Sequence, residues 1–131
     1  MELKVKLEGA KRVSTQIGDH LIMTDQPVKH GGTNEAPAPY DLFLASIATC
    51  AGFYIQSYCE NKNIDSTGIE ISLNVTRDEK QSINGFVTTI SVPEEIPEKL
   101  HPVLKKVASQ CAVKKTIMSK PQFVVETINH Q

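Results

Sequence analysis

Three cysteines, Cys50, Cys59 and Cys111, are the residues of this sequence whose type and spacing could support covalent chemistry. Two thiols can act together in redox catalysis: a thiolate attacks a peroxide oxygen, and a second thiol converts the resulting sulfenic acid to a disulfide. The attacking sulfur needs a lowered pKa, from a cation or hydrogen-bond donors, and a partly apolar pocket for the substrate. Alternatively each thiol is a small buried side chain, the more frequent role of free cysteine, so patterning alone leaves both interpretations open.

Helical spacing limits which thiols could share a site. Cys50 lies midway along an uncharged apolar segment and Cys111 ends an apolar stripe, so we expect both to face the interior. Cys59 follows Cys50 by nine residues, and at about 100° per residue this is half a revolution of a helix. If two cysteines cooperate, the pair is therefore Cys50 with Cys111.

Other polar residues near the cysteines are weaker candidates. Lys114 and Lys115 follow Cys111 closely and could lower a thiol pKa, although a solvated helix face is the more frequent role of such residues. His30, in the loop before the apolar segment, is the histidine of most interest. No cysteines lie two to four residues apart, and no histidine pairs with a cysteine at zinc-finger spacing. We therefore expect no metal site and no cofactor.

Hydrophobic periodicity predicts the elements that position these residues. Pro39 suits the first position of a helix running to about Asn61, with Asp41 in its first turn. Apolar intervals of three, four and seven predict a helix over 100–111, and 113–119 could form a short one. Strands are expected over 3–7, 12–17, 20–24, 69–75, 86–92 and 123–128. The order βββ-α-ββ-α-(α)-β predicts an α+β protein with antiparallel hairpins, the first strand half-buried.

The segment from Leu42 to Cys59 has eighteen residues without a charge, near the lower limit of about 17 for a helix that spans a membrane. It carries polar residues such as Ser46 and Gln56, and no basic cluster follows it. We expect a helix buried on nearly all sides in a protein core, with a membrane span as the alternative.

Composition limits the function classes. The 131 residues suit one domain, 1–131, and a net charge of −1 with 5% aromatic residues argues against a face for nucleic acid or anionic lipid. The first fifteen residues alternate charged and apolar side chains without the apolar core of an export signal. We therefore expect a cytoplasmic protein whose thiols stay reduced.

The segment from Gly31 to Cys50, GGTNEAPAPYDLFLASIATC, resembles the one that opens the central helix of the OsmC/Ohr family, the osmotically inducible protein C and organic hydroperoxide resistance proteins. A Gly-rich loop precedes a proline that begins the helix, and Cys50 follows Pro39 by eleven residues as in that pattern. The segment CAVKKTI from Cys111 resembles the second cysteine of the family and its short apolar continuation. The resemblance covers essentially the whole chain.

This resemblance implies the OsmC-like fold and an intertwined homodimer, with the two long central helices enclosed by sheets from both chains. It implies two active sites near the dimer interface, where Cys50 attacks the peroxide and Cys111 resolves the oxidised cysteine. The implied reaction reduces an organic hydroperoxide to an alcohol. Its electrons come from a dithiol such as a lipoylated protein.

The sequence departs from the best-known peroxidases of that family at two points. Tyr40 stands where they have a glutamate that pairs with an activating arginine, and the acid Asp41 comes one residue later. The chain has two arginines, of which Arg12 is the better candidate for that role, although neither lies in a recognisable copy of the arginine motif. The sequence is therefore most similar to the OsmC-like branch. The alternatives are a non-catalytic protein binding a small apolar ligand at the dimer interface, and a different thiol enzyme on the same fold.

Overall fold

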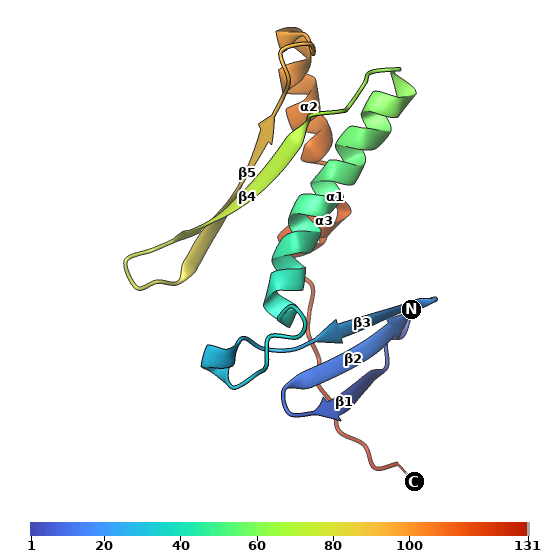
Figure 1. Cartoon of the computed structure of the whole chain (residues 1–131), viewed down its shortest axis with the longest axis vertical. Helices are drawn as coiled ribbons and strands as arrows, with labels where there is room; N and C mark the ends of the chain where they lie inside the picture. The colour runs from blue at the N-terminus through green and yellow to red at the C-terminus, as the bar shows by residue number, and fades with distance from the viewer. Residues whose placement is uncertain (131) are drawn as a thin grey trace. The chain divides into compact units, whose positions relative to one another are not determined.

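The computed structural model describes residues 1–130 and has the expected α+β architecture, with two antiparallel sheets and three α-helices among these residues (Figure 1). The elements are β1 Val5–Gly9, β2 Arg12–Ile17, β3 His20–Thr24, α1 Pro39–Asn61, β4 Glu70–Arg77, β5 Ile83–Ser91, α2 His101–Ala108 and α3 Ala112–Met118. Contacts within the chain define two compact units, Met1–Ser46 and Ile47–Gln131. That the chain is a single domain stays a prediction.

The first unit carries the three-stranded antiparallel sheet in the order β1-β2-β3. Ile17 pairs with His20 across the predicted tight turn, where Gly18 adopts a φ of 57° that favours glycine. The expectation that the first strand is half-buried is wrong for this chain, because all five residues of β1 are exposed. No other layer within this unit covers them.

The loop after β3 is organised by the carboxylate of Asp25, which is 1% exposed. It accepts hydrogen bonds from the backbone N–H groups of Gln26 at 2.7 Å and Glu35 at 3.0 Å, and from the Thr33 hydroxyl at 2.8 Å. The N–H of Glu35, then that of Gln26, with a smaller contribution from Thr33, lower the pKa of Asp25 to about 2 against the opposing effect of burial. A Cβ atom at Gly32 would overlap the carbonyl oxygen of Gln26, so the backbone of the loop approaches itself too closely for a side chain there.

The long helix α1 begins and ends where its capping residues dictate. Pro39 opens it, because the first helical position loses nothing from a missing N–H. At its end Asn63 adopts a left-handed φ of 54° and donates its N–H to the Glu60 carbonyl. The N–H of Ile64 donates to the Cys59 carbonyl at 2.8 Å, which completes a Schellman motif and stops the helix.

Burial of α1 follows a single face. Its buried side chains recur every four residues at Ile47, Ala51, Ile55 and Cys59, whereas Phe53 is 63% exposed. The expectation of a helix buried on nearly all sides is therefore wrong for one chain, because the second unit covers α1 from one direction only. By length and composition α1 could cross a membrane, a test that core helices of soluble proteins also pass.

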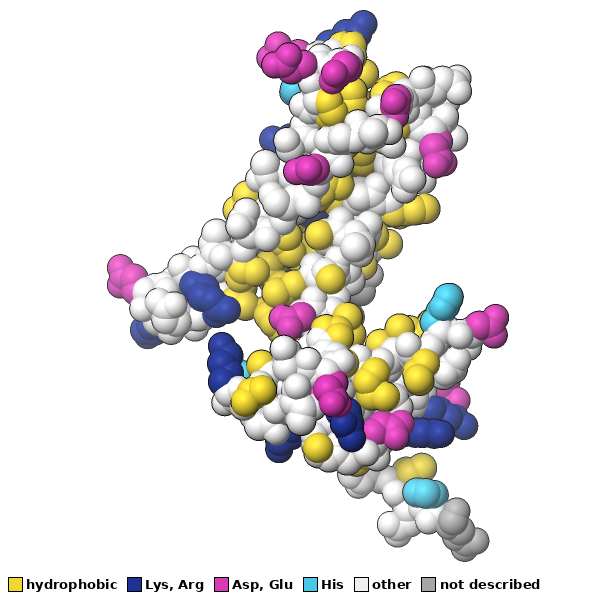
Figure 2. Space-filling view, viewed as in Figure 1, with side chains coloured by type: hydrophobic (Ala, Val, Ile, Leu, Met, Phe, Trp, Pro, Cys, Tyr) yellow, Lys and Arg dark blue, Asp and Glu magenta, His cyan; other side chains and the backbone are white. Residues whose placement is uncertain are grey.

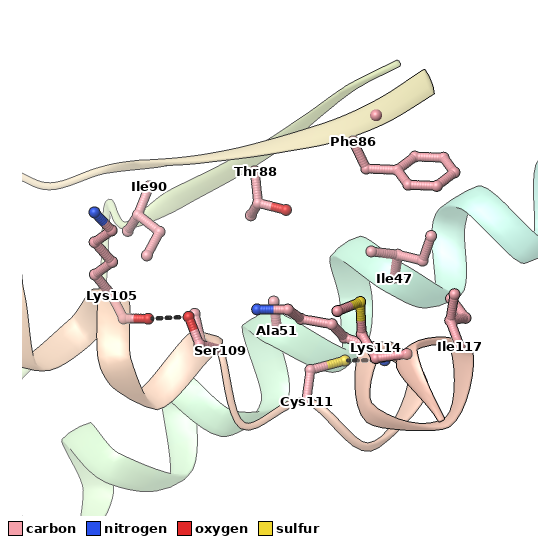
Figure 3. A pocket seen from close by; sticks show the side chains of 13 residues that line it. Ile47, Ala51, Phe86, Thr88, Ile90, Lys105, Ser109, Cys111, Lys114 and Ile117 are labelled. Carbon is pink, nitrogen blue, oxygen red and sulfur yellow. Dashed lines mark hydrogen bonds between the residues drawn. The ribbon is translucent and has the colours of Figure 1, made fainter. Parts of the chain in front are cut away.

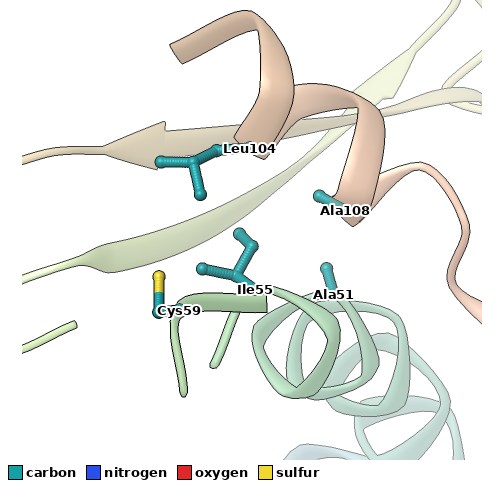
Figure 4. Packing of buried hydrophobic residues seen from close by; sticks show 5 residues of the cluster. All are labelled: Ala51, Ile55, Cys59, Leu104 and Ala108. Carbon is teal, nitrogen blue, oxygen red and sulfur yellow. The ribbon is translucent and has the colours of Figure 1, made fainter. Parts of the chain in front are cut away.

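The core of the second unit lies between α1, α2 and the β4–β5 hairpin. Figure 4 shows α1 and α2 facing each other through buried apolar side chains, namely Ala51, Ile55, Cys59, Leu104 and Ala108. The hairpin adds partly buried side chains such as Ile71 and Ile90, which pair across β4 and β5. These contacts fix the hairpin against the helices and so position the residues described below.

The helix predicted over 100–111 ends earlier than expected. α2 stops at Ala108, where the Ser109 hydroxyl donates to the Lys105 carbonyl at 2.9 Å. Cys111 then adopts an extended conformation, with φ −49° and ψ 125°, and caps the short helix α3. The cysteine therefore belongs to the start of a new helix and not to the end of the preceding stripe.

The strand expected over 123–128 is not formed among the described residues. Its apolar side chains are 69–92% exposed, namely Phe123, Val124, Val125 and Ile128. A strand exists only when its backbone groups pair with a neighbouring strand. Within residues 1–130 no strand pairs with this segment, although its sequence has the composition of one.

Candidate functional site

The structure brings Cys50 and Cys111 together, and it places Cys59 in a different environment. Cys50, on α1, is half-buried and shares a side-chain hydrogen bond with Cys111. Cys59 is completely buried in the core, where burial raises the pKa of its thiol. All three cysteines are free. Cys50 and Cys59 therefore lie on different faces of α1, as their nine-residue spacing indicated.

The surroundings of Cys50 favour its thiolate. Burial raises the pKa of Cys50, but hydrogen bonds from the Cys111 side chain and from the backbone N–H groups of Val113 and Ala112 outweigh it. The net pKa of Cys50 therefore lies below its ordinary value. These N–H donors are available because they belong to the first turn of α3, where N–H groups have no partner within the helix.

The surroundings of Cys111 favour its thiol. Burial is the largest cause that raises the pKa of Cys111, and its hydrogen bond and charge interaction with Cys50 add to it. The N–H of Lys114 donates to the Cys111 sulfur at 3.5 Å, which lowers this pKa without reversing its direction. The surroundings of the two thiols therefore shift their pKa values in opposite directions.

A pocket of about 450 Å³ opens beside this pair within the second unit. Figure 3 shows the side chains of Phe86, Thr88 and Ile90 pointing from β5 toward the helices, with Cys111 and Ile117 on the opposite side. Apolar side chains also gather beside the β4–β5 hairpin on the face drawn in Figure 2. Cys111 lines the pocket, whereas Cys50 does not.

The pocket wall from β5 is the part of this site that sequence reasoning missed. Phe86, Thr88 and Ile90 alternate along the strand, so they share one face. This period-two pattern was the available signal, but it identifies a face without showing that α3 lies opposite it. Ser109 and Met118 also line the pocket, and nothing in their local sequence indicates this position.

The lysines after Cys111 differ in position. Lys114 lines the pocket, and its side chain lies across the floor with the ammonium group pointing away from α3 (Figure 3). Both lysines are exposed, but Lys115 is not among the pocket residues. Nothing in the sequence distinguishes these neighbouring lysines. They differ because successive residues of the α3 helix point in different directions.

The remaining predicted site residues lie in the first unit. The guanidinium of Arg12 forms an ion pair with Glu35 at 2.7 Å. Tyr40 packs its ring against Phe43 at a centroid distance of 5.6 Å, and Asp41 lies in the first turn of α1. Among residues 1–130, no group of three or more His, Cys, Asp or Glu side chains is placed to hold a metal ion.

Comparisons with known proteins agree on one family. A family model described as OsmC-like protein matches residues 32–126. A solved Psychrobacter arcticus structure, of an osmotic stress induced and detoxification response protein, is 26% identical with a TM-score of 0.72, over 87% of this chain and 85% of that one. No curated protein matches the chain.

Two further solved structures share the fold at lower identity. An OsmC-like protein from Mycoplasma pneumoniae is 14% identical, with a TM-score of 0.71 over 89% of this chain and 86% of that one. The organic hydroperoxide resistance protein OhrB of Bacillus subtilis is 20% identical, with a TM-score of 0.56 over 88% of this chain and 90% of that one.

Proposed function

Because this chain belongs to the OsmC-like protein family, we propose that it is a cysteine-based peroxidase that reduces organic hydroperoxides in stress defence. Cys50 is the peroxide-attacking cysteine and Cys111 the resolving cysteine. The observation that carries the proposal is geometric: the Cys50 side chain is hydrogen-bonded to Cys111 and to the backbone N–H groups at the start of α3, beside a pocket that Cys111 lines. The name of the Bacillus subtilis relative, an organic hydroperoxide resistance protein, supports the substrate class.

The reaction begins with the Cys50 thiolate. Its sulfur attacks the terminal oxygen of the hydroperoxide, the O–O bond breaks, and the departing alkoxide takes a proton to become the alcohol. Cys50 is then a sulfenic acid. Cys111 attacks this sulfur, forming the Cys50–Cys111 disulfide and releasing water. A dithiol reductant, such as a lipoylated protein, then supplies two electrons and returns both cysteines to the reduced form.

Residues of the first unit are proposed to support this reaction by analogy with the family pattern. Asp41 and Tyr40 follow the proline that begins α1, the position at which well-known peroxidases of the family have their glutamate. Arg12 is the candidate for the activating cation. Its ion pair with Glu35 shows that this guanidinium already binds a carboxylate.

The proposal includes a homodimer in the cytoplasm. The exposed apolar side chains of α1, β1 and the segment 123–128 support a second chain as their cover, since large exposed apolar surfaces mark interaction sites. Three free cysteines suit a reducing compartment.

Consumption of an organic hydroperoxide by the purified protein with excess dithiol tests the activity. We expect turnover in the unchanged protein and in Cys59→Ser, and none in Cys50→Ser. Cys111→Ser should accumulate Cys50 sulfenic acid and turn over poorly. Equal rates for the Cys50→Ser and Cys59→Ser proteins would rule out the peroxidase.

The pocket supports a second candidate function, the binding of a small apolar ligand without catalysis. Its volume of about 450 Å³ lies within the range of ligand sites, about 300–1,000 Å³. Binding of a hydrophobic fluorescent probe, displaced by short-chain lipids in both the unchanged protein and Cys50→Ser, would favour this role if peroxide consumption is absent.

A further inference from the structure

Two cavities lie next to each other between α2 and the strand β5. The first, of about 450 Å³, is the pocket that Cys111 lines. The second, of about 290 Å³, lies toward the start of α2, where His101 is part of its lining. Thr88, Ile90 and Lys105 line both cavities, so these three side chains form a partition between them. The two cavities are therefore one groove that is divided at the partition.

The partition is built from both sides of the groove. Ile90 and Thr88 lie two positions apart on β5, so they share the strand face that is turned to the helices. Figure 3 shows Ile90 pointing from β5 toward α2, and the stem of Lys105 rising from α2. Lys105 is exposed, so its ammonium group stays in water while its alkyl stem covers apolar surface. Ile90 is half-buried and is the one fully apolar member of the partition.

We propose that Ile90 sets the length of the organic group that this site accepts, because it closes the groove between the two cavities. The inference rests on the proposed function in taking this group to be the alkyl chain of a hydroperoxide. The peroxide end of the substrate lies at the Cys111 end of the groove, where Cys50 is one hydrogen bond away. The chain runs from there along β5 and stops at the partition. Ile90 is thus a specificity-determining residue that takes no part in the reaction.

The length of the chain matters because the lining of the first cavity is mostly apolar. Each methylene group that moves from water into such a lining favours binding about fourfold, which corresponds to about 0.8 kcal/mol. A chain that already reaches Ile90 gains nothing from further methylene groups, since these must bend back or stay in water. Beyond the partition, Val92 and Leu104 offer more apolar lining, which a chain reaches only when the groove is open.

The hairpin provides a matched control for Ile90. Ile71 pairs with Ile90 across β4 and β5, and both side chains are half-buried against the same core cluster. Ile71 lines neither cavity. Ile71→Ala and Ile90→Ala therefore remove the same atoms from similar packing, and only Ile90→Ala opens the partition.

The test measures consumption of straight-chain alkyl hydroperoxides, from butyl to decyl, with excess dithiol. In the unchanged protein kcat/KM should rise with chain length and then level off. In Ile90→Ala the ratio of kcat/KM for decyl over butyl hydroperoxide should increase roughly tenfold, the gain from burying about two more methylene groups. Ile71→Ala should keep the ratio of the unchanged protein. An unchanged ratio in Ile90→Ala, or the same increase in Ile71→Ala, would overturn the proposal.

Lys105 gives a second test at an exposed position, which decides the question if Ile90→Ala does not fold. Lys105→Ala removes the stem from the partition and should also shift the preference toward decyl hydroperoxide. Lys105→Met keeps a stem of nearly the same length and should not shift it. Lys106→Ala is the control, because Lys106 lines neither cavity. A shift as large in Lys105→Met as in Lys105→Ala would assign the effect to charge and contradict the partition.

Binding of the alcohol products separates this inference from the peroxidase proposal. Straight-chain alcohols, from butanol to decanol, should displace bound N-phenyl-1-naphthylamine, a neutral apolar fluorophore, without any reaction of the cysteines. The ratio of decanol to butanol affinity should increase roughly tenfold in Ile90→Ala, as for the hydroperoxides, and stay unchanged in Ile71→Ala. This result in a protein without peroxidase activity would remove the peroxidase and keep the length limit. An active peroxidase whose variants all share one affinity ratio would remove the length limit and keep the peroxidase.

Discussion

The Cys111 side chain shares a hydrogen bond with Cys50, and this single contact moves the pKa values of the two thiols in opposite directions. The hydrogen bond stabilises the thiolate of Cys50 and so lowers its pKa. It raises the pKa of Cys111, because the Cys111 thiol must keep its proton to donate this bond. Burial of Cys111 and the backbone N–H groups of Val113 and Ala112 beside Cys50 act in the same directions, so two residues of the same type, 61 positions apart in the chain, differ in pKa.

This relationship predicts the order in which the thiols react. Because the pKa of Cys50 is lowered and those of Cys111 and Cys59 are raised, Cys50 should be alkylated at a lower pH than either. Iodoacetamide labelling across a pH series, read by peptide mass mapping, gives the three midpoints. In Cys111→Ala the loss of the hydrogen bond should move the Cys50 midpoint upward. Labelling of Cys59 before Cys50 would contradict the assignment.

Because the pKa of Asp25 is lowered in the folded protein, we expect the fold to lose stability in acid. Its folded pKa is about 2 and its ordinary value 3.8, so the carboxylate stabilises the fold fully above the ordinary value. That contribution falls as the pH drops through this window toward 2. Urea unfolding of Asp25→Asn should show lower stability near neutral pH and a weaker acid dependence than the unchanged protein. Asp19→Asn, at an exposed turn, is the control and should unfold like the unchanged protein.

From the packing of the second unit's core, we expect a cavity made there to lower the free energy of unfolding substantially. Leu104 is 1% exposed and belongs to the cluster that joins α2 to α1. Leu104→Ala should lower the free energy of unfolding by about 2–5 kcal/mol, as measured in urea. Val28→Ala, at a side chain that is 72% exposed, should change it by less than about 0.5 kcal/mol. Similar values for both variants would contradict the packing described.

The uncovered faces predict self-association. Phe53 on α1 and Leu7 on β1 are 63% and 86% exposed, although both are large apolar side chains. Sedimentation equilibrium at micromolar concentration should give a dimer mass. Phe53→Glu should weaken the dimer, while Glu60→Gln on the same helix should leave it intact. A folded, monodisperse monomer of the unchanged protein would refute the dimer.

Local signals in the sequence predicted much of the fold. Pro39 marked the start of α1, alternating residues marked a strand in each of the two sheets, and nine-residue spacing separated Cys50 from Cys59. These features depend on neighbours within a few turns of the same element. The pairing of Cys50 with Cys111 was inferred because both belong to apolar helical patterns, so both were expected to face the interior.

Features that depend on distant contacts were harder to predict. The alternation in 123–128 predicted a strand, but a strand also needs a partner, which the described chain does not supply. α2 ends at Ala108 and not at Cys111, because the N–H groups of Gln110 and Cys111 bond carbonyls three residues back and do not continue the α-helical pattern. The pocket could not be foreseen, since Phe86 and Ile117 become neighbours only through the packing of the second unit.

The pairing register of β4 and β5 determines which β5 side chains line the pocket. Leu73 pairs with Thr88, and Val75 with Phe86, while a register shift follows at Thr76 and Arg77. Beyond the shift the Asp78 carboxylate accepts the N–H groups of Lys80 and Ser82 and holds the turn. Because side chains alternate along a strand, inserting one residue into this turn would exchange inward and outward positions of β5. The length of this turn therefore determines which β5 side chains line the pocket. A change in the turn, which contacts neither cysteine, would replace Phe86, Thr88 and Ile90 in the pocket lining.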